Sequence, residues 1–120
     1  MIDSFGGVIF WTQNLETMVA FYRDTLGLPI HSVRPEFVAF QLGEVRVSVG
    51  RHSEVCGQTR EPVRVMVNFG VDDIASACER LRAAGVEFVR APEREHWGGW
   101  VASFCDPDGN TLQLLQQPDA

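Results

Sequence analysis

Apolar and polar residues follow the same order twice along the chain, over about 5–50 and again over about 63–117. Each stretch opens with a short apolar run that indicates a β-strand. A helix-capping residue follows, Asn14 in the first stretch and Asp73 in the second, and apolar residues then recur at the spacing of one helix face. The apolar face of the first predicted helix comprises Leu15, Met18, Val19, Tyr22 and Leu26, and that of the second comprises Ile74, Ala77, Cys78 and Leu81.

The two predicted helices align residue by residue from their caps, except that the first has one more residue before its closing glycine. That glycine is Gly27 in the first stretch and Gly85 in the second. Three short extended segments follow each helix, at about 28–33, 36–42 and 45–50, and at about 86–90, 99–105 and 111–117. We therefore expect an α+β fold made of two tandem βαβββ modules.

Turn and linker residues complete this organisation. Leu42-Gly43-Glu44 and Asp106-Pro107-Asp108-Gly109 are typical of hairpin turns, in which aspartate side chains accept local backbone N–H bonds. The residues between the modules, about 51–62, are polar and without period, which indicates a linker. Such a linker allows the modules to pair within one chain or to be exchanged between two chains. We expect one domain over residues 1–120.

Charge and composition exclude several classes of function. Sixteen acidic residues against ten basic ones give a net charge of −6, which argues against a nucleic-acid partner. All ten basic residues are arginine, so lysine Schiff-base and P-loop chemistry are impossible. No apolar run approaches the roughly 18 residues of a membrane span. Three cysteines and the absence of a signal-peptide pattern predict a soluble cytoplasmic protein with reduced thiols, of which Cys56 is exposed and Cys78 and Cys105 are buried.

Several short motifs together resemble one known superfamily. They are Asn14-Leu15-Glu16, Phe21-Tyr22-Arg23-Asp24, Leu26-Gly27-Leu28, Trp97-Gly98-Gly99 and Phe104-Cys105-Asp106-Pro107-Asp108-Gly109-Asn110. In this order, within a duplicated βαβββ frame, they resemble the vicinal oxygen chelate superfamily of glyoxalases, extradiol dioxygenases and bleomycin-resistance proteins. The resemblance implies a curved eight-stranded mixed sheet around a cleft, in which the enzymes hold one divalent metal ion.

The resemblance also identifies the positions where the metal ligands of these enzymes would lie, on the first and last strands of each module. In this chain those positions are Gly7, Ser48, Met66 and Gln113. A catalytic divalent ion needs about three ligands from histidine and carboxylate side chains, and this set supplies none. We therefore expect neither a metal ion nor another cofactor.

Alternation along the strands predicts which side chains line the cleft. The expected ligand-binding residues are Ile9, Trp11, Arg46, Ser48, Met66, Asn68, His96, Trp97, Trp100 and Gln113. His96 and Trp97 are placed at the cleft lip because they flank Gly98-Gly99. The opposite strand faces are predicted to form core with the helices, and they carry Phe10, Val45, Val47, Val49, Val65, Val67 and Phe69. His31 and His52 are expected at the surface, without a carboxylate to orient either ring.

Three functions are compatible with these features. The first is a metal-independent protein that binds a small, planar, antibiotic-like molecule, as in the bleomycin-resistance branch, and the net negative charge favours a cationic guest. The second is a glyoxalase-like lyase or isomerase, or a dioxygenase, with metal ligands elsewhere, so the sequence leaves open whether the protein is an enzyme. The third is a protein-interaction module. A homodimer, with or without exchanged modules, is expected from the resemblance.

Overall fold

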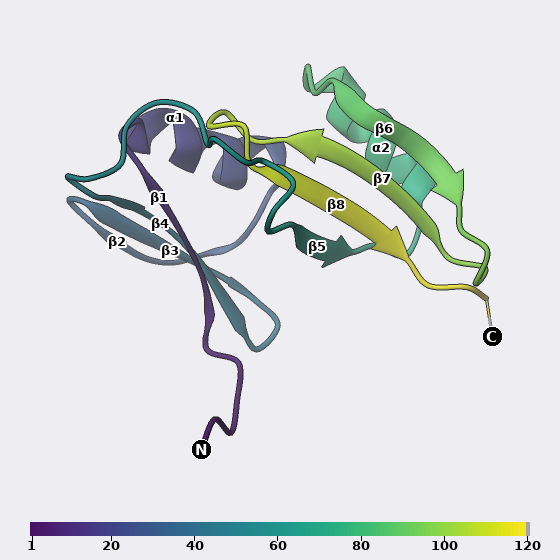
Figure 1. The fold of residues 1–120 in the computed structure, drawn as a ribbon, viewed down its shortest axis with the longest axis horizontal. Coiled ribbons are helices and arrows are strands. Elements are labelled where there is room, and N and C mark those ends of the chain that lie inside the picture. The colour runs from purple at the N-terminus through teal and green to yellow at the C-terminus, as the bar shows by residue number, and fades with distance from the viewer. Residues whose placement is uncertain (120) are drawn as a thin grey trace. The chain divides into compact units, whose positions relative to one another are not determined.

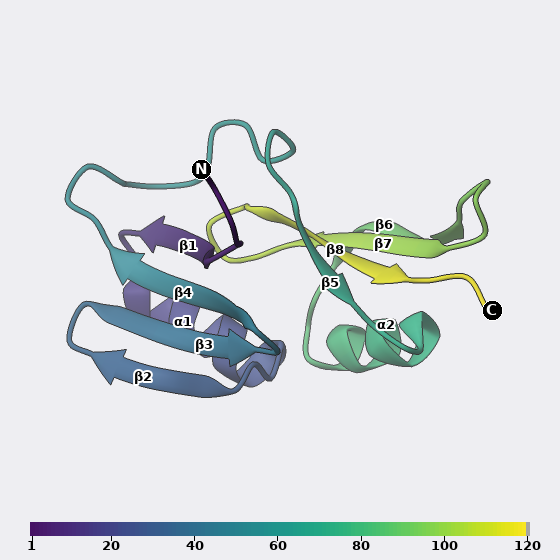
Figure 2. The same ribbon diagram turned by 90° about the horizontal axis from the view of Figure 1, so that it is seen from below.

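The computed structural model of the chain describes residues 1–119 and divides into two compact units, residues 1–57 and those from 58 onward. Each unit has the element order βαβββ, which confirms the module predicted from the sequence. Figures 1 and 2 show in each unit a helix lying along one face of a four-stranded sheet. The fold is therefore α+β, with the eight predicted strands present, four to a sheet.

The first unit contains β1 (Gly7–Thr12), α1 (Leu15–Ala20), the π-helical turn η1 (Phe21–Thr25), β2 (Ile30–Arg34), β3 (Phe37–Leu42) and β4 (Val45–Arg51). The second contains β5 (Val67–Gly70), α2 (Ile74–Ala83), β6 (Phe88–Arg94), β7 (Trp100–Cys105) and β8 (Thr111–Gln116). The strand orders are β1-β4-β3-β2 and β5-β8-β7-β6. In each sheet the first and last strands pair in parallel and the remaining neighbours are antiparallel.

The extra residue of the first helix is accommodated in a wider turn. Leu26 N donates to Phe21 O five residues earlier, at 2.9 Å, whereas α2 keeps α-helical bonding to its end, where Ala84 N donates to Arg80 O at 3.2 Å. A single π turn inserts one residue without breaking the helix. Tyr22 in η1 remains fully buried, so the wider turn preserves the apolar face.

The two helices begin differently. Asp73 caps α2 as predicted, because its Oδ1 accepts from Ser76 N at 3.1 Å. Gln116 Oε1 on β8 accepts from Ile74 N at 2.7 Å and satisfies a second N-terminal donor of this helix. The predicted side-chain cap by Asn14 is wrong: that side chain makes no capping bond to α1, and Asn14 N instead donates to the buried Thr12 Oγ1 at 2.9 Å.

The Asp-Pro-Asp-Gly turn is confirmed, but its two aspartates differ. Asp106 Oδ1 accepts from the backbone N–H groups of Asp108 and Asn110, at 3.0 and 2.9 Å. Asp108 contributes its backbone carbonyl, which accepts from Thr59 N at 2.9 Å. Its buried Oδ1 has no hydrogen-bond partner within residues 1–119, so side-chain turn chemistry explains Asp106 alone.

The predicted core faces are buried or half-buried, with one exception. Val65 was expected in the core, but it follows a turn that precedes β5 and is 77% exposed. Because β5 begins only at Val67, Val65 lies outside the strand, and the alternation of inward and outward side chains does not extend to it. No helix among the described residues has the length and apolar character needed to cross a bilayer.

Candidate functional site

The sheet face turned away from α1 in the first unit carries four of the ten predicted site residues, Ile9, Trp11, Arg46 and Ser48, and we call it the open face. The helix side is identified by Phe10, whose ring stacks on Tyr22 with centroids 5.1 Å apart. Strand alternation then turns the intervening residues to the other side. The register of β1, β4 and β3 sets three rows on the open face: Trp11, Gly50 and Phe37; Ile9, Ser48 and Ala39; and Gly7, Arg46 and Gln41.

An aromatic cluster occupies one end of the open face. The Trp11 ring lies 5.8 Å from Phe37 and 5.3 Å from His52, the latter edge-on. Gly50 lies between the two larger rings, and a Cβ there would come within 2.6 Å of both. Trp11 is nevertheless 40% exposed. The Trp11 ring is inclined by 55° to the Phe37 ring and by 71° to the His52 ring, so the partly exposed Trp11 indole is the planar surface that the cluster offers to a planar molecule.

A polar cluster occupies the other end. Arg46 Nε donates to Gln41 Oε1 at 2.9 Å, and Arg46 Nη2 lies 3.2 Å from His31 Nε2, which accepts this bond in the neutral tautomer that carries its proton on Nδ1. These three exposed or half-exposed side chains come from β4, β3 and β2. A guanidinium that contacts an amide and an imidazole but no carboxylate keeps its positive charge available to a ligand.

A pair of amides forms the second polar feature, on the sheet of the second unit. Gln113 Nε2 donates to Asn68 Oδ1 at 2.7 Å across the parallel pair β5 and β8. Neither side chain makes another hydrogen bond within residues 1–119. Gln113 Oε1 therefore remains available as an acceptor and Asn68 Nδ2 as a donor. The pair can therefore recognise a group that itself offers one donor and one acceptor.

The remaining predicted residues lie in other places of the second unit. His96 and Trp97 are exposed in the turn between β6 and β7, where the Trp97 ring lies over Gly99. Met66 precedes β5 and is half-buried. Trp100 pairs with Gln116, whose side chain caps α2, so the structure places Trp100 on the helix side of its sheet.

The positions that correspond to metal ligands do not fit a metal ion. Gly7 has a φ of +151°, and a Cβ there would collide with the Arg46 carbonyl oxygen, so the backbone itself excludes a ligating side chain. Ser48 is 3% exposed, and Gln113 offers one amide oxygen rather than a histidine or carboxylate donor. Within residues 1–119, no three His, Cys, Asp or Glu side chains come together as a metal-binding group. The donors present therefore do not match a divalent catalytic centre.

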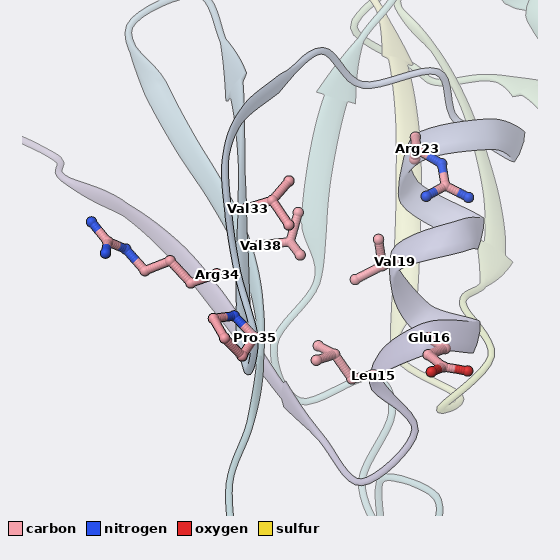
Figure 3. Close-up of a pocket in the computed structure, with 8 residues that line it drawn as sticks. All are labelled: Leu15, Glu16, Val19, Arg23, Val33, Arg34, Pro35 and Val38. Carbon is pink, nitrogen blue, oxygen red and sulfur yellow. The ribbon is translucent and has the colours of Figure 1, made fainter.

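A groove of about 670 Å³ lies on the opposite side of the first sheet, between α1 and the β2–β3 hairpin. Figure 3 shows Leu15 and Val19 of α1 pointing toward Val33 and Val38 of the hairpin. Arg23 at its rim is bonded to Asp24 at 2.8 Å, and this hydrogen bond holds the pKa of the Asp24 carboxyl below its usual value. The groove is largely apolar, and no residue predicted for the site lines it.

The thiols offer no nucleophile to the site. Cys56 is exposed and Cys78 is buried, as predicted, whereas Cys105 is half-buried rather than buried. Burial raises the pKa of the Cys78 thiol, and the nearby positive charge of Arg82 offsets this only in part. Because the thiolate is the reactive form, Cys78 is a packing residue.

Four side chains that contact Trp11 or Arg46 were absent from the predicted site: Phe37, Gln41, His31 and His52. The turn at Gly43 could have predicted Phe37 and Gln41. The hairpin that it closes pairs Leu42 with Val45, and this register places Phe37 beside Gly50. No comparable signal exists for the histidines. His31 lies at a bulge in β2, and His52 follows the end of β4.

Comparisons with known proteins agree with this fold. The profile of the Glyoxalase/Bleomycin resistance protein/Dioxygenase superfamily matches residues 4–114. The chain is 29% identical over 116 residues to the uncharacterized protein YraH of Bacillus subtilis (strain 168), covering 87% of this chain and 91% of that protein. It is 34% identical over 53 residues to a bleomycin resistance protein of Klebsiella pneumoniae, covering 38% and 42% of the two chains.

A solved structure gives the same result for the fold. A glyoxalase/bleomycin resistance protein/dioxygenase from Nocardioides superimposes with a TM-score of 0.77 at 24% identity, covering all of this chain and 87% of the other. The chain therefore belongs to the Glyoxalase/Bleomycin resistance protein/Dioxygenase superfamily.

Proposed function

We propose that this protein binds a planar small molecule on the open face without a metal ion. The observation that carries the proposal is the exposed Trp11 ring, set beside Phe37 over Gly50. A glycine under two aromatic rings lets them approach the strand, so the platform is rigid before any ligand arrives. Preorganised aromatic surface with a few polar groups around it is the usual composition of a small-molecule site.

Two further features support a binding role over catalysis. The donor set at Gly7, Ser48, Met66 and Gln113 does not suit the metal on which the enzymes of the superfamily depend. The local relation to a bleomycin resistance protein favours binding of an antibiotic-like molecule.

The test is a screen of planar compounds by thermal shift, with hits measured by isothermal titration calorimetry in the presence and absence of EDTA. We expect affinity to be independent of EDTA, and Trp11→Ala to weaken binding about tenfold, since aromatic contacts are worth on the order of 1 kcal/mol beyond buried area. Trp100→Ala is the matched control, because that ring lies on the helix side.

Loss of binding on adding EDTA would contradict the proposal, and so would equal effects of Trp11→Ala and Trp100→Ala. Elemental analysis of the purified protein provides an independent check. One divalent metal ion per chain after growth in metal-replete medium would favour the lyase or dioxygenase alternative.

A further inference from the structure

We propose that the Arg46 end of the open face is an anion subsite, so that the planar ligand carries a carboxylate. This inference rests on the proposed function, since it assigns the chemical class of ligand to the same face. It also predicts a sign of charge opposite to the one that the net charge of −6 favours.

The partners of Arg46 distinguish it from the ion-paired arginines of the chain. Arg23, Arg51, Arg64 and Arg90 each have a carboxylate within 2.7–2.9 Å, from Asp24, Glu36, Glu61 and Glu95 respectively. Arg46 instead contacts the amide of Gln41 and the imidazole of His31. Its Nη1 has no hydrogen-bond partner among residues 1–119. The Arg46 charge is thus uncompensated although the chain has acidic residues in excess.

Arg46 is also held in position, unlike an arginine that extends freely into solvent. Gln41 on β3 and His31 on β2 contact two of its three nitrogens, so the conformational entropy lost on binding an anion is reduced. Gly7, its partner on β1, has no side chain that could cover it. A guanidinium with free N–H groups forms short, charge-assisted hydrogen bonds to a carboxylate.

The spacing of the two ends limits the shape of the ligand. Arg46 and Gly50 are four residues apart on β4, so their α carbons are separated by about 13 Å at the rise of a β-strand. Ser48, with its small side chain, lies between them on the same face. A molecule with a flat ring system at one end and a carboxylate at the other fits this arrangement.

The experiment compares 2-naphthoate with its neutral isostere 2-naphthamide by calorimetry at constant ionic strength. We expect the wild-type protein to bind the acid at least tenfold more tightly than the amide, a difference of about 1.4 kcal/mol. Arg46→Gln should lower affinity for the acid about tenfold and change affinity for the amide less than twofold. Arg64→Gln, which removes the same charge from an exposed ion pair in the second unit, is the matched control and should change neither.

Each outcome separates this inference from the proposed function. Equal affinity of the wild-type protein for acid and amide, absence of naphthoate binding at millimolar concentration, or equal effects of Arg46→Gln on both compounds would overturn the anion subsite. If Trp11→Ala weakens both compounds in that case, the binding face stands and only its charge preference is wrong. If Arg46→Gln discriminates while Trp11→Ala changes neither compound, the anion subsite stands and the aromatic platform is wrong.

Discussion

At Gly50 the absence of a side chain lets Trp11 and Phe37 lie against the backbone of β4. A methyl group at this position would lie within 2.6 Å of both rings and would push them apart. Gly7 presents a related case, because its backbone approaches the Arg46 carbonyl too closely for any side chain. Two glycines thus shape the open face. Gly50 lets the aromatic rings pack against the strand, and Gly7 leaves Arg46 uncovered.

Gly50→Ala should therefore destabilise the fold by about 1–3 kcal/mol, the usual cost of overpacking, and alter the tryptophan emission spectrum. Urea unfolding and fluorescence measure the two effects. Gly70→Ala on β5 is the control, because a Cβ there would meet nothing within 4 Å and its φ is compatible with alanine. Equal stability of the two variants would show that the rings do not rest on Gly50.

Among the elements, the two helices show which features the sequence pattern predicts and which it does not. Their apolar faces and closing glycines occur where the pattern predicts, and the one additional residue before Gly27 is the residue that forms the π turn. The sequence comparison of the two modules thus located the insertion. The sequence does not show that the extra residue forms a π turn. That outcome depends on the tertiary packing of Tyr22 against Phe10 and Phe40.

The two helix N-termini lead to a prediction about capping. Asp73→Ala should cost about 1 kcal/mol, since it removes the acceptor of the Ser76 N–H group. Asn14→Ala should cost only a few tenths, because the Asn14 side chain makes no capping bond. Chemical denaturation of both variants measures the difference. A larger loss of stability for Asn14→Ala than for Asp73→Ala would contradict the assignment of the caps.

For the whole molecule, the homodimer expected from the family resemblance is a prediction that can be tested directly. Several β-branched residues are largely exposed: Val33 (67%), Val63 (71%), Val65 (77%) and Val89 (71%). Exposed apolar surface of this kind favours association when it is contiguous. We predict that sedimentation equilibrium at micromolar concentration gives a species of twice the 13.4 kDa chain mass. A species of 13.4 kDa under the same conditions would contradict the dimer.

The sequence by itself determined the duplicated βαβββ order, the turns, the cap of α2 and the absence of metal-ligating residues at the expected positions. These features depend on local spacing, on turn chemistry and on residue identity, which a linear pattern contains. It also placed Ile9, Trp11 and Arg46 on one face, because alternation in a strand needs only the strand itself.

Only the tertiary structure decided which of these side chains contact residues that are distant in the sequence. His52 reaches Trp11 after the end of β4, and His31 reaches Arg46 from a bulge in β2. A bulge shifts the register, and a loop has no period, so neither contact follows from spacing. Trp100 lies in β7, which pairs with β8 without a bulge, and its face follows from its pairing with Gln116, whose side chain bonds to the N-terminus of α2.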